Sequence, residues 1–120
     1  MSALPARCTP CRKGAAPLGR SEAEQRLGHV PSWTLDFPRL RRAFELPDFL
    51  GALAWTNRVG QLAEQEGHHP DFHLTGWKHV ELVLSTHAIG GLSDNDFVLA
   101  SAIDRAWERF QDGAGSSGPR

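Results

Sequence analysis

Three of the six histidines in this 120-residue sequence stand at two places where ordered segments are expected to end. His68 and His69 follow Glu64 by four and five residues, and His87 closes a run of alternating apolar and polar residues. An imidazole has an unperturbed pKa of about 6.5, so it can donate or accept a proton near neutral pH. A carboxylate one helical turn before an imidazole can hold that ring in place. The two places therefore indicate a site for general acid–base chemistry.

Rigid elements lead into both places. Apolar residues at three- and four-residue spacing predict a long helix from Pro47 to Glu66, with Asp48 in its first turn. Gly67 can take the left-handed conformation that ends such a helix, and Pro70 cannot continue it. The alternation between Trp77 and Thr86 predicts a strand whose core face comprises Val80, Leu82, Leu84 and Thr86. The apolar stripe of the helix comprises Phe49, Ala52, Leu53, Trp55, Val59, Leu62 and Ala63.

A short helix and a hairpin are expected before the long helix. Ser21, with Glu24 three residues later, has the spacing of a capping box and predicts a helix that ends near Gly28. The runs Trp33–Phe37 and Leu40–Phe44 predict the two strands of a hairpin. A small basic cluster, which forms either a solvated sheet edge or an anion site, comprises Arg39, Arg41 and Arg42.

Two strands and a helix are expected after the long helix. Asp71–Leu74 predicts a short strand, and Ser93 caps a last helix that ends at Gly113. The order helix, two strands, helix, two strands, helix predicts an α+β domain. We expect a four-stranded, mostly antiparallel sheet with helices packed on one face. The buried stripe of the last helix comprises Phe97, Ala100, Ile103, Trp107 and Phe110.

Composition and length indicate one folded domain. The hydrophobic fraction is 40% and the formal net charge is −1, which argues against a disordered chain and a strongly basic nucleic-acid-binding surface. No apolar run approaches the roughly 18 residues that cross a membrane, and the N-terminus shows no apolar signal-peptide core. We therefore expect a cytoplasmic protein with a flexible arm at 1–19, a folded domain at 20–112 and a disordered tail at 113–120.

Cys8 and Cys11 form a CxxC pair in the arm and are the only two cysteines. The pair supplies half of the four ligands of a structural zinc site, which histidines or a second chain would have to complete. A redox role requires the pair to open a helix after a strand, and that context is missing. A solvated arm with two reducible thiols is the alternative, so the role of the pair stays open. At the histidines we expect no metal, because adjacent imidazoles such as His68 and His69 seldom point at one ion.

Seven spaced residues form the most specific pattern of the sequence, namely Glu64, His68, His69, Pro70, Trp77, His87 and Asp96. In this pattern the chain resembles the pterin-4a-carbinolamine dehydratases, over the range from about Ser21 to Trp107. The resemblance implies conversion of 4a-hydroxytetrahydrobiopterin, or a related pterin, to quinonoid dihydropterin and water. It also implies that no metal or organic cofactor takes part, and that the step recycles the cofactor of aromatic amino-acid hydroxylases. Members of the family are typically homodimers or homotetramers, built through the sheet edge and the long helix.

The resemblance also implies roles for individual residues. His68, His69 and His87 are the expected catalytic residues. We expect His68 and His87 to exchange protons with the 4a-hydroxyl and a ring nitrogen, and His69 to orient the pterin. Positioned acid–base groups of this kind are worth roughly 10²–10⁴ in rate. Glu64 is expected to fix an imidazole or bind the pterin amino groups, Trp33 to stack on the ring or belong to the core, and Asp96 to serve the site or the helix start. The expected substrate-binding residues are Glu64, Trp33, Asp96 and Trp77.

A non-catalytic binding module on the same fold, acting as an assembly chaperone or dimerisation cofactor, is the alternative function. The intact set of histidines favours the enzyme. The expected partners are the pterin and further copies of the chain, with an aromatic amino-acid hydroxylase system as a candidate client. Neither nucleic acid nor a membrane is expected as a partner. The sequence does not identify the 6-substituent of the pterin.

Overall fold

The computed structural model describes residues 16–116 of the chain. Its elements confirm the expected order of helices and strands. A single 3-10 turn, η1 (His87–Ile89), lies between the last strand and the last helix. The elements are α1 (Arg20–Leu27), β1 (Thr34–Asp36), β2 (Arg39–Glu45), α2 (Phe49–Glu66), β3 (Asp71–Thr75), β4 (His79–Leu84) and α3 (Asp94–Ser116).

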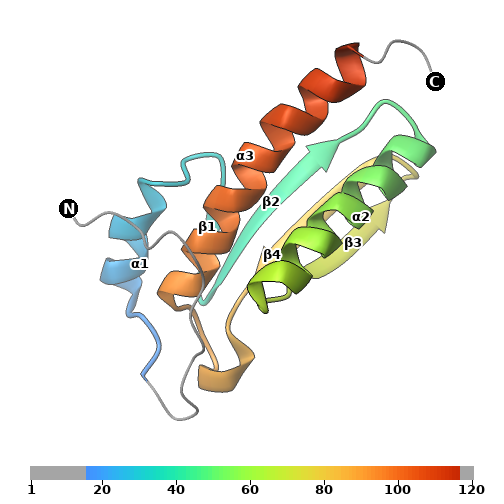
Figure 1. The fold of residues 1–120 in the computed structure, drawn as a ribbon. Coiled ribbons are helices and arrows are strands. Elements are labelled where there is room, and N and C mark those ends of the chain that lie inside the picture. Colours follow the sequence, from blue (N-terminus) through green and yellow to red (C-terminus); the bar gives the residue numbers. More distant parts are fainter. Residues whose placement is uncertain (1–15, 117–120) are drawn as a thin grey trace.

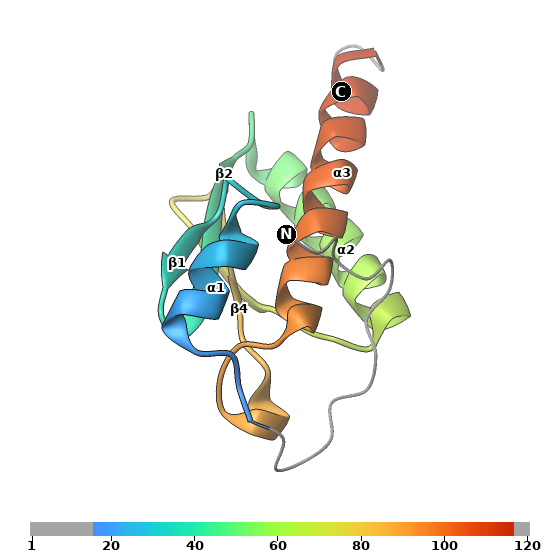
Figure 2. The same ribbon diagram turned by 90° about the vertical axis from the view of Figure 1, so that its left-hand side faces the viewer.

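The four strands form one sheet in the order β1-β2-β4-β3, and every neighbouring pair is antiparallel. The two hairpins therefore meet through β2 and β4, which leaves β1 and β3 at the edges. Helices α2 and α3 lie on the same face of the sheet (Figures 1 and 2). The expected α+β sheet with helices on one face is confirmed.

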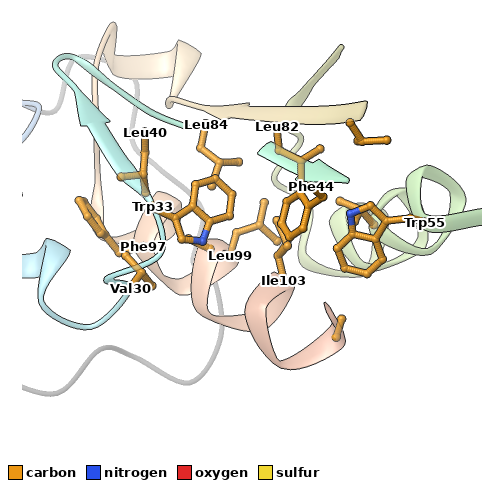
Figure 3. Close-up of a cluster of buried hydrophobic side chains, with 14 of the residues drawn as sticks. Val30, Trp33, Leu40, Phe44, Trp55, Leu82, Leu84, Phe97, Leu99 and Ile103 are labelled. Carbon is orange, nitrogen blue, oxygen red and sulfur yellow. The ribbon is translucent and has the colours of Figure 1, made fainter. Parts of the chain in front are cut away.

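The core lies between this sheet face and the helices (Figure 3). Alternate residues of the central strands point into it, as in the cross-strand pairs Leu40–Leu84 and Phe44–Val80. Four aromatic rings from β2, α2 and α3 pack against one another at one end, with ring centroids 4.8–6.1 Å apart. These rings belong to Phe44, Trp55, Trp107 and Phe110.

Helix α2 ends at Glu66 as the sequence predicts, but it begins at Phe49 rather than Pro47. The Asp48 side chain caps its start by accepting a hydrogen bond from the Gly51 N–H at 2.7 Å. Gly67 takes the left-handed conformation with φ +67°, and the His68 N–H donates to the Ala63 carbonyl at 3.2 Å. This termination fixes the backbone of His68 directly beyond the last helical turn.

The buried stripe of α2 is narrower than predicted. Ala52, Trp55, Val59 and Ala63 are buried, whereas Phe49 and Leu53 are 48% and 43% exposed. Both exposed residues lie in the first turns of the helix, which the described chain leaves partly uncovered. Helical spacing identified the apolar stripe, but it could not show which part of that stripe the rest of the domain buries.

Most strand ends differ from the sequence prediction by one or two residues, and three element ends differ for a visible reason. Helix α1 begins at Arg20 rather than Ser21, because the Glu22 carboxylate accepts from the Gly19 N–H at 2.9 Å. Strand β4 begins at His79, since Trp77 lies in the preceding turn with φ +57°. Helix α3 continues through Gly113 to Ser116, so the tail expected to be disordered begins as helix. A helical glycine costs about 1 kcal/mol, which weakens a helix without ending it.

The last residues of the expected N-terminal arm are held against the domain. The Leu18 N–H donates to the Leu92 carbonyl at 2.8 Å, and Pro17 lies so close to Gly91 that an added Cβ would sit 2.8 Å from the proline. Pro17 and Leu18, which the sequence prediction assigned to the arm, therefore contact the folded domain. The CxxC pair lies outside the described residues. Within residues 16–116, no helix is long and apolar enough to cross a membrane.

Candidate active site

The Asp96 carboxylate joins two of the predicted histidine-bearing segments. Its side chain is completely buried. Oδ1 lies 2.6 Å from Nε2 of His68, and Oδ2 accepts from the Thr86 hydroxyl at 2.8 Å and the Ser93 N–H at 2.9 Å. His68 from the segment after α2 therefore meets Thr86 and Ser93 from the segment after β4 at one carboxylate.

Asp96 holds this place because of how α3 begins. The Ser93 hydroxyl accepts from the Asn95 N–H at 3.2 Å, and the Asp96 side chain, three residues after Ser93, accepts from the Ser93 N–H. This reciprocal arrangement is a variant of the capping box, in which the Ser93 hydroxyl bonds to the N–H of the second helical residue instead of the third. The expected role of Asp96 at the helix start is thus filled by Oδ2, while Oδ1 of the same side chain contacts an imidazole.

The contact with Asp96 determines which ring nitrogen of His68 carries a proton. The carboxylate already accepts two hydrogen bonds on Oδ2, so a proton on Nε2 of His68 makes the 2.6 Å contact a donated hydrogen bond. Nδ1 then has its lone pair free in the neutral ring, and no described residue bonds to it. The His68 side chain is 11% exposed, which limits competition from water at the Asp96 contact.

His69 has a carboxylate partner of a different kind. Its Nε2 lies 2.9 Å from Oε1 of Glu64, and the two side chains are 61% and 81% exposed. The sequence predicted that Glu64 would fix an imidazole or bind the substrate, and it contacts His69 rather than the buried ring next to it. An exposed pair of this kind is weak, of order 0–1 kcal/mol, and can rearrange around a ligand.

His87 is the first residue of η1 and its side chain is exposed. The preceding residue, Thr86, pairs with Gly91, because its N–H donates to the Gly91 carbonyl at 2.7 Å. Gly90 closes the turn in the left-handed conformation, with φ +69°. Figure 1 shows η1 at the same end of the molecule as the end of α2 and the start of α3. His87 therefore directly follows Thr86, the residue whose hydroxyl contacts Asp96.

Trp33 and Trp77 lie away from this cluster. Trp33 is 3% exposed within the hydrophobic core, and its Nε1 donates to Asp104 Oδ1 at 2.7 Å. Of the two roles expected for Trp33, packing in the core fits this position, and stacking on the pterin does not. Trp77 is 57% exposed in the β3–β4 turn. The six residues of β4, which span roughly 20 Å at about 3.3 Å per residue, lie between this turn and Thr86.

Glu45, the last residue of β2, shows the one clear pKa shift among the described residues. Lys78 hydrogen-bonds to the exposed carboxylate of Glu45 at 3.1 Å. That hydrogen bond, then the Lys78 charge and the nearby His79, lower the pKa of Glu45 from its ordinary value of 4.5. Lys78 also lies 5.1 Å from the centre of the Trp77 ring.

Thr86 is a site residue that the sequence reasoning missed. Alternation along the strand assigned it to the core, and it is 4% exposed. The available signal was that a buried hydroxyl at a strand end needs a hydrogen-bond partner. Among residues 16–116, no group of three or more His, Cys, Asp or Glu side chains could hold a metal ion.

Residues 16–106 match the family "Pterin 4 alpha carbinolamine dehydratase". A protein of Halorhodospira halophila named "Putative pterin-4-alpha-carbinolamine dehydratase" is 44% identical over 106 residues, which cover 87% of this chain and 96% of that relative.

Two solved structures share the fold. A "transcriptional coactivator/pterin dehydratase" from Brucella melitensis superposes with a TM-score of 0.67 and 25% identity, over 74% of this chain and 96% of that one. A "pterin dehydratase-like protein" described as a RuBisCO assembly factor in the alpha-carboxysome gives a TM-score of 0.51 at 22% identity, over 64% of this chain and 90% of that one. The second likeness concerns the fold alone.

Proposed function

The chain belongs to the pterin-4a-carbinolamine dehydratase family, and we propose that it converts a 4a-hydroxytetrahydropterin to a quinonoid dihydropterin and water. The observation that carries this proposal is the buried contact between His68 and Asp96 at the meeting point of α2, β4 and α3. This contact fixes the orientation of the His68 ring and the ring nitrogen that carries its proton. An acid–base reaction without redox change needs groups of this kind.

The reaction requires two proton transfers. In our proposal, Nδ1 of His68 removes the proton from the ring nitrogen next to C4a, because Nε2 already carries the proton shared with Asp96. The electron pair of that N–H bond forms the C=N bond as the C4a–O bond breaks. His87 gives a proton to the departing hydroxyl, which leaves as water. Solvent then returns a proton to His87 and takes one from His68, so the cycle balances.

The separate roles are supported by burial: His68 and Asp96 are largely buried, whereas His87, His69 and Glu64 are exposed. Asp96 stabilises the His68 imidazolium that forms when the ring takes up the substrate proton, as the carboxylate of a catalytic triad does. His87 is exposed and can exchange its proton with solvent. His69 and Glu64, also exposed, orient the pterin at the mouth of the site through ring stacking or hydrogen bonds to its amino groups.

The test follows the decay of freshly generated 4a-hydroxytetrahydropterin by absorbance. We expect the wild type to accelerate this decay, and His68→Ala and His87→Ala each to lose roughly 10²–10⁴ of that acceleration. His79→Ala is the matched control, because it removes an exposed histidine at the opposite end of β4. A folded His68→Ala protein with the wild-type rate would contradict the assignment.

We also propose a second copy of the chain as partner, with β3 as the meeting edge. A symmetric antiparallel pair uses all five residues of β3 only when His73, its middle residue, lies on the twofold axis. Residues of β3 whose numbers sum to 146 then face each other, which brings the β3–β4 turn of the partner subunit, with its Trp77, toward the connection between α2 and β3 that carries His69. In this arrangement the expected substrate-binding role of Trp77 is supplied across the interface.

A binding role is the second candidate function, since the Brucella protein is also described as a transcriptional coactivator. Its support here is an exposed apolar group on the first turns of α2, with Leu50 74% exposed beside Phe49 and Leu53. A protein with a binding role alone would keep its biological activity when His68, His69 and His87 are all replaced by alanine. Loss of that activity in the triple variant would instead assign the role to the dehydratase.

A further inference from the structure

The Thr86 hydroxyl is a buried polar group that the acid–base mechanism above does not use. It lies 2.8 Å from Oδ2 of Asp96 and 2.9 Å from the Ser93 hydroxyl, in a residue that is 4% exposed. We propose that Thr86 is a positioning residue. Its hydroxyl orients the Asp96 carboxylate so that Oδ1 takes the Nε2 proton of His68, and thereby selects the tautomer that presents Nδ1 to the substrate. This inference rests on the proposed function only for its catalytic consequence.

The direction of each hydrogen bond follows from the donors available. A backbone N–H can only donate, so the 2.9 Å contact from Ser93 N makes Oδ2 of Asp96 an acceptor. The single proton of the Thr86 hydroxyl goes to the same oxygen. The Ser93 hydroxyl must then donate to Thr86, because the Thr86 proton is already used. The protons of these hydrogen bonds therefore all point toward Asp96.

These two donors hold the carboxylate by one oxygen and leave the other for His68. With Oδ2 fixed, the plane of the carboxylate is set, and Oδ1 stays 2.6 Å from Nε2. Without the threonine hydroxyl, Oδ2 keeps only the Ser93 N–H and the buried carboxylate loses part of its stabilisation. The carboxylate can then rotate, and the proton of the neutral His68 ring is free to move to Nδ1.

Selection of one tautomer matters because the other presents a donor where the reaction needs an acceptor. A neutral ring with its proton on Nδ1 cannot take the proton from the pterin nitrogen. We therefore expect Thr86→Val to lower kcat roughly ten- to hundredfold, the range that corresponds to losing one hydrogen bond to a charged group. KM should change little, because Thr86 is only 4% exposed and in this proposal acts through Asp96 and His68.

The experiment compares Thr86→Val with Thr86→Ser, which keeps the hydroxyl, and with Thr56→Val. The last variant is the matched control, because Thr56 is a partly buried threonine on α2 whose hydroxyl bonds to the Ala52 carbonyl at 2.8 Å. The ring ¹⁵N and ¹H signals of His68, assigned by their loss in His68→Gln, report the tautomer directly. Wild type, Thr86→Ser and Thr56→Val should show the Nε2–H form at alkaline pH, and Thr86→Val a mixture.

The tautomer readout does not require dehydratase activity, so the two proposals can fail separately. An Nε2–H ring in Thr86→Val would overturn the positioning role, even if kcat fell. An inactive wild type would overturn the proposed function and leave the tautomer result standing. Thr86→Cys, with a weak donor of similar size, is the second variant if the valine protein does not fold. It should also show a mixture, and a pure Nε2–H ring there would contradict the proposal.

Discussion

Replacing Asp96 with asparagine, a side chain of nearly the same shape, should move the ring proton of neutral His68 from Nε2 to Nδ1. The position of Oδ2 receives two hydrogen bonds, from Thr86 and the Ser93 N–H, so the amide oxygen must occupy it. The amide NH₂ then takes the place of Oδ1, 2.6 Å from Nε2 of His68. An NH₂ group donates, so Nε2 becomes an acceptor and the ring proton moves to Nδ1.

The expected loss in kcat for Asp96→Asn is about 10²–10⁴, because the base is removed and the imidazolium loses its counter-charge. The three hydrogen bonds at this position remain but lose their charge assistance. We therefore expect the free energy of unfolding to fall by only about 1–3 kcal/mol, which leaves the protein folded at 25 °C. The pterin assay gives kcat and KM, and urea unfolding gives the stability change.

Asp104→Asn is the matched control for this variant. Asp104 lies on the same helix and accepts from Trp33 Nε1 at 2.7 Å and Arg42 Nη1 at 2.6 Å, so its loss also weakens charge-assisted bonds. We expect a similar fall in stability and an unchanged kcat. Wild-type kcat in Asp96→Asn, or an equal loss of kcat in Asp104→Asn, would refute the reasoning.

Three further predictions concern the exposed parts of the molecule. Glu64→Gln and His69→Ala should raise KM more than they lower kcat in the pterin assay, because this exposed pair orients the substrate; an effect confined to kcat would contradict that role. Glu45 has a lowered pKa in the folded protein, so its contribution to stability is present above pH 4.5 and is lost as the pH falls through the folded value. The difference in urea midpoint between wild type and Glu45→Gln should therefore shrink on acidification, and a difference that grows would show the opposite sign. His73→Glu should reduce the mass measured by light scattering to that of one chain, because the twofold axis through the exposed residue 73 would set two like charges opposite each other, and an unchanged mass would exclude the β3 interface.

The sequence by itself determined the elements of this protein and the end of α2. Periodicity, capping and glycine conformation act over three to five residues, so α2 and its end at Gly67 could be predicted in place, and only its start was placed two residues too early. The same local rules put His68 just beyond the helix. They also indicated acid–base chemistry, because the residue types and their spacing are visible without coordinates.

Only the tertiary structure decided which groups contact each other. Asp96 lies 28 residues after His68, and no local rule connects them, since their contact depends on how α3 packs against α2 and β4. The sequence paired Glu64 with an imidazole but could not tell which one. Likewise, alternation predicted that Thr86 faces inward, but packing gave its hydroxyl the Asp96 carboxylate as partner.

The two tryptophans show the same division. Both belong to sequence patterns that suggested a substrate site. Packing places Trp33 in the core, where Asp104 satisfies its N–H, and leaves Trp77 exposed at the far end of β4. Spacing along a chain fixes which residues lie on one element. Distances between elements are set by burial of the apolar faces, which is a property of the whole domain.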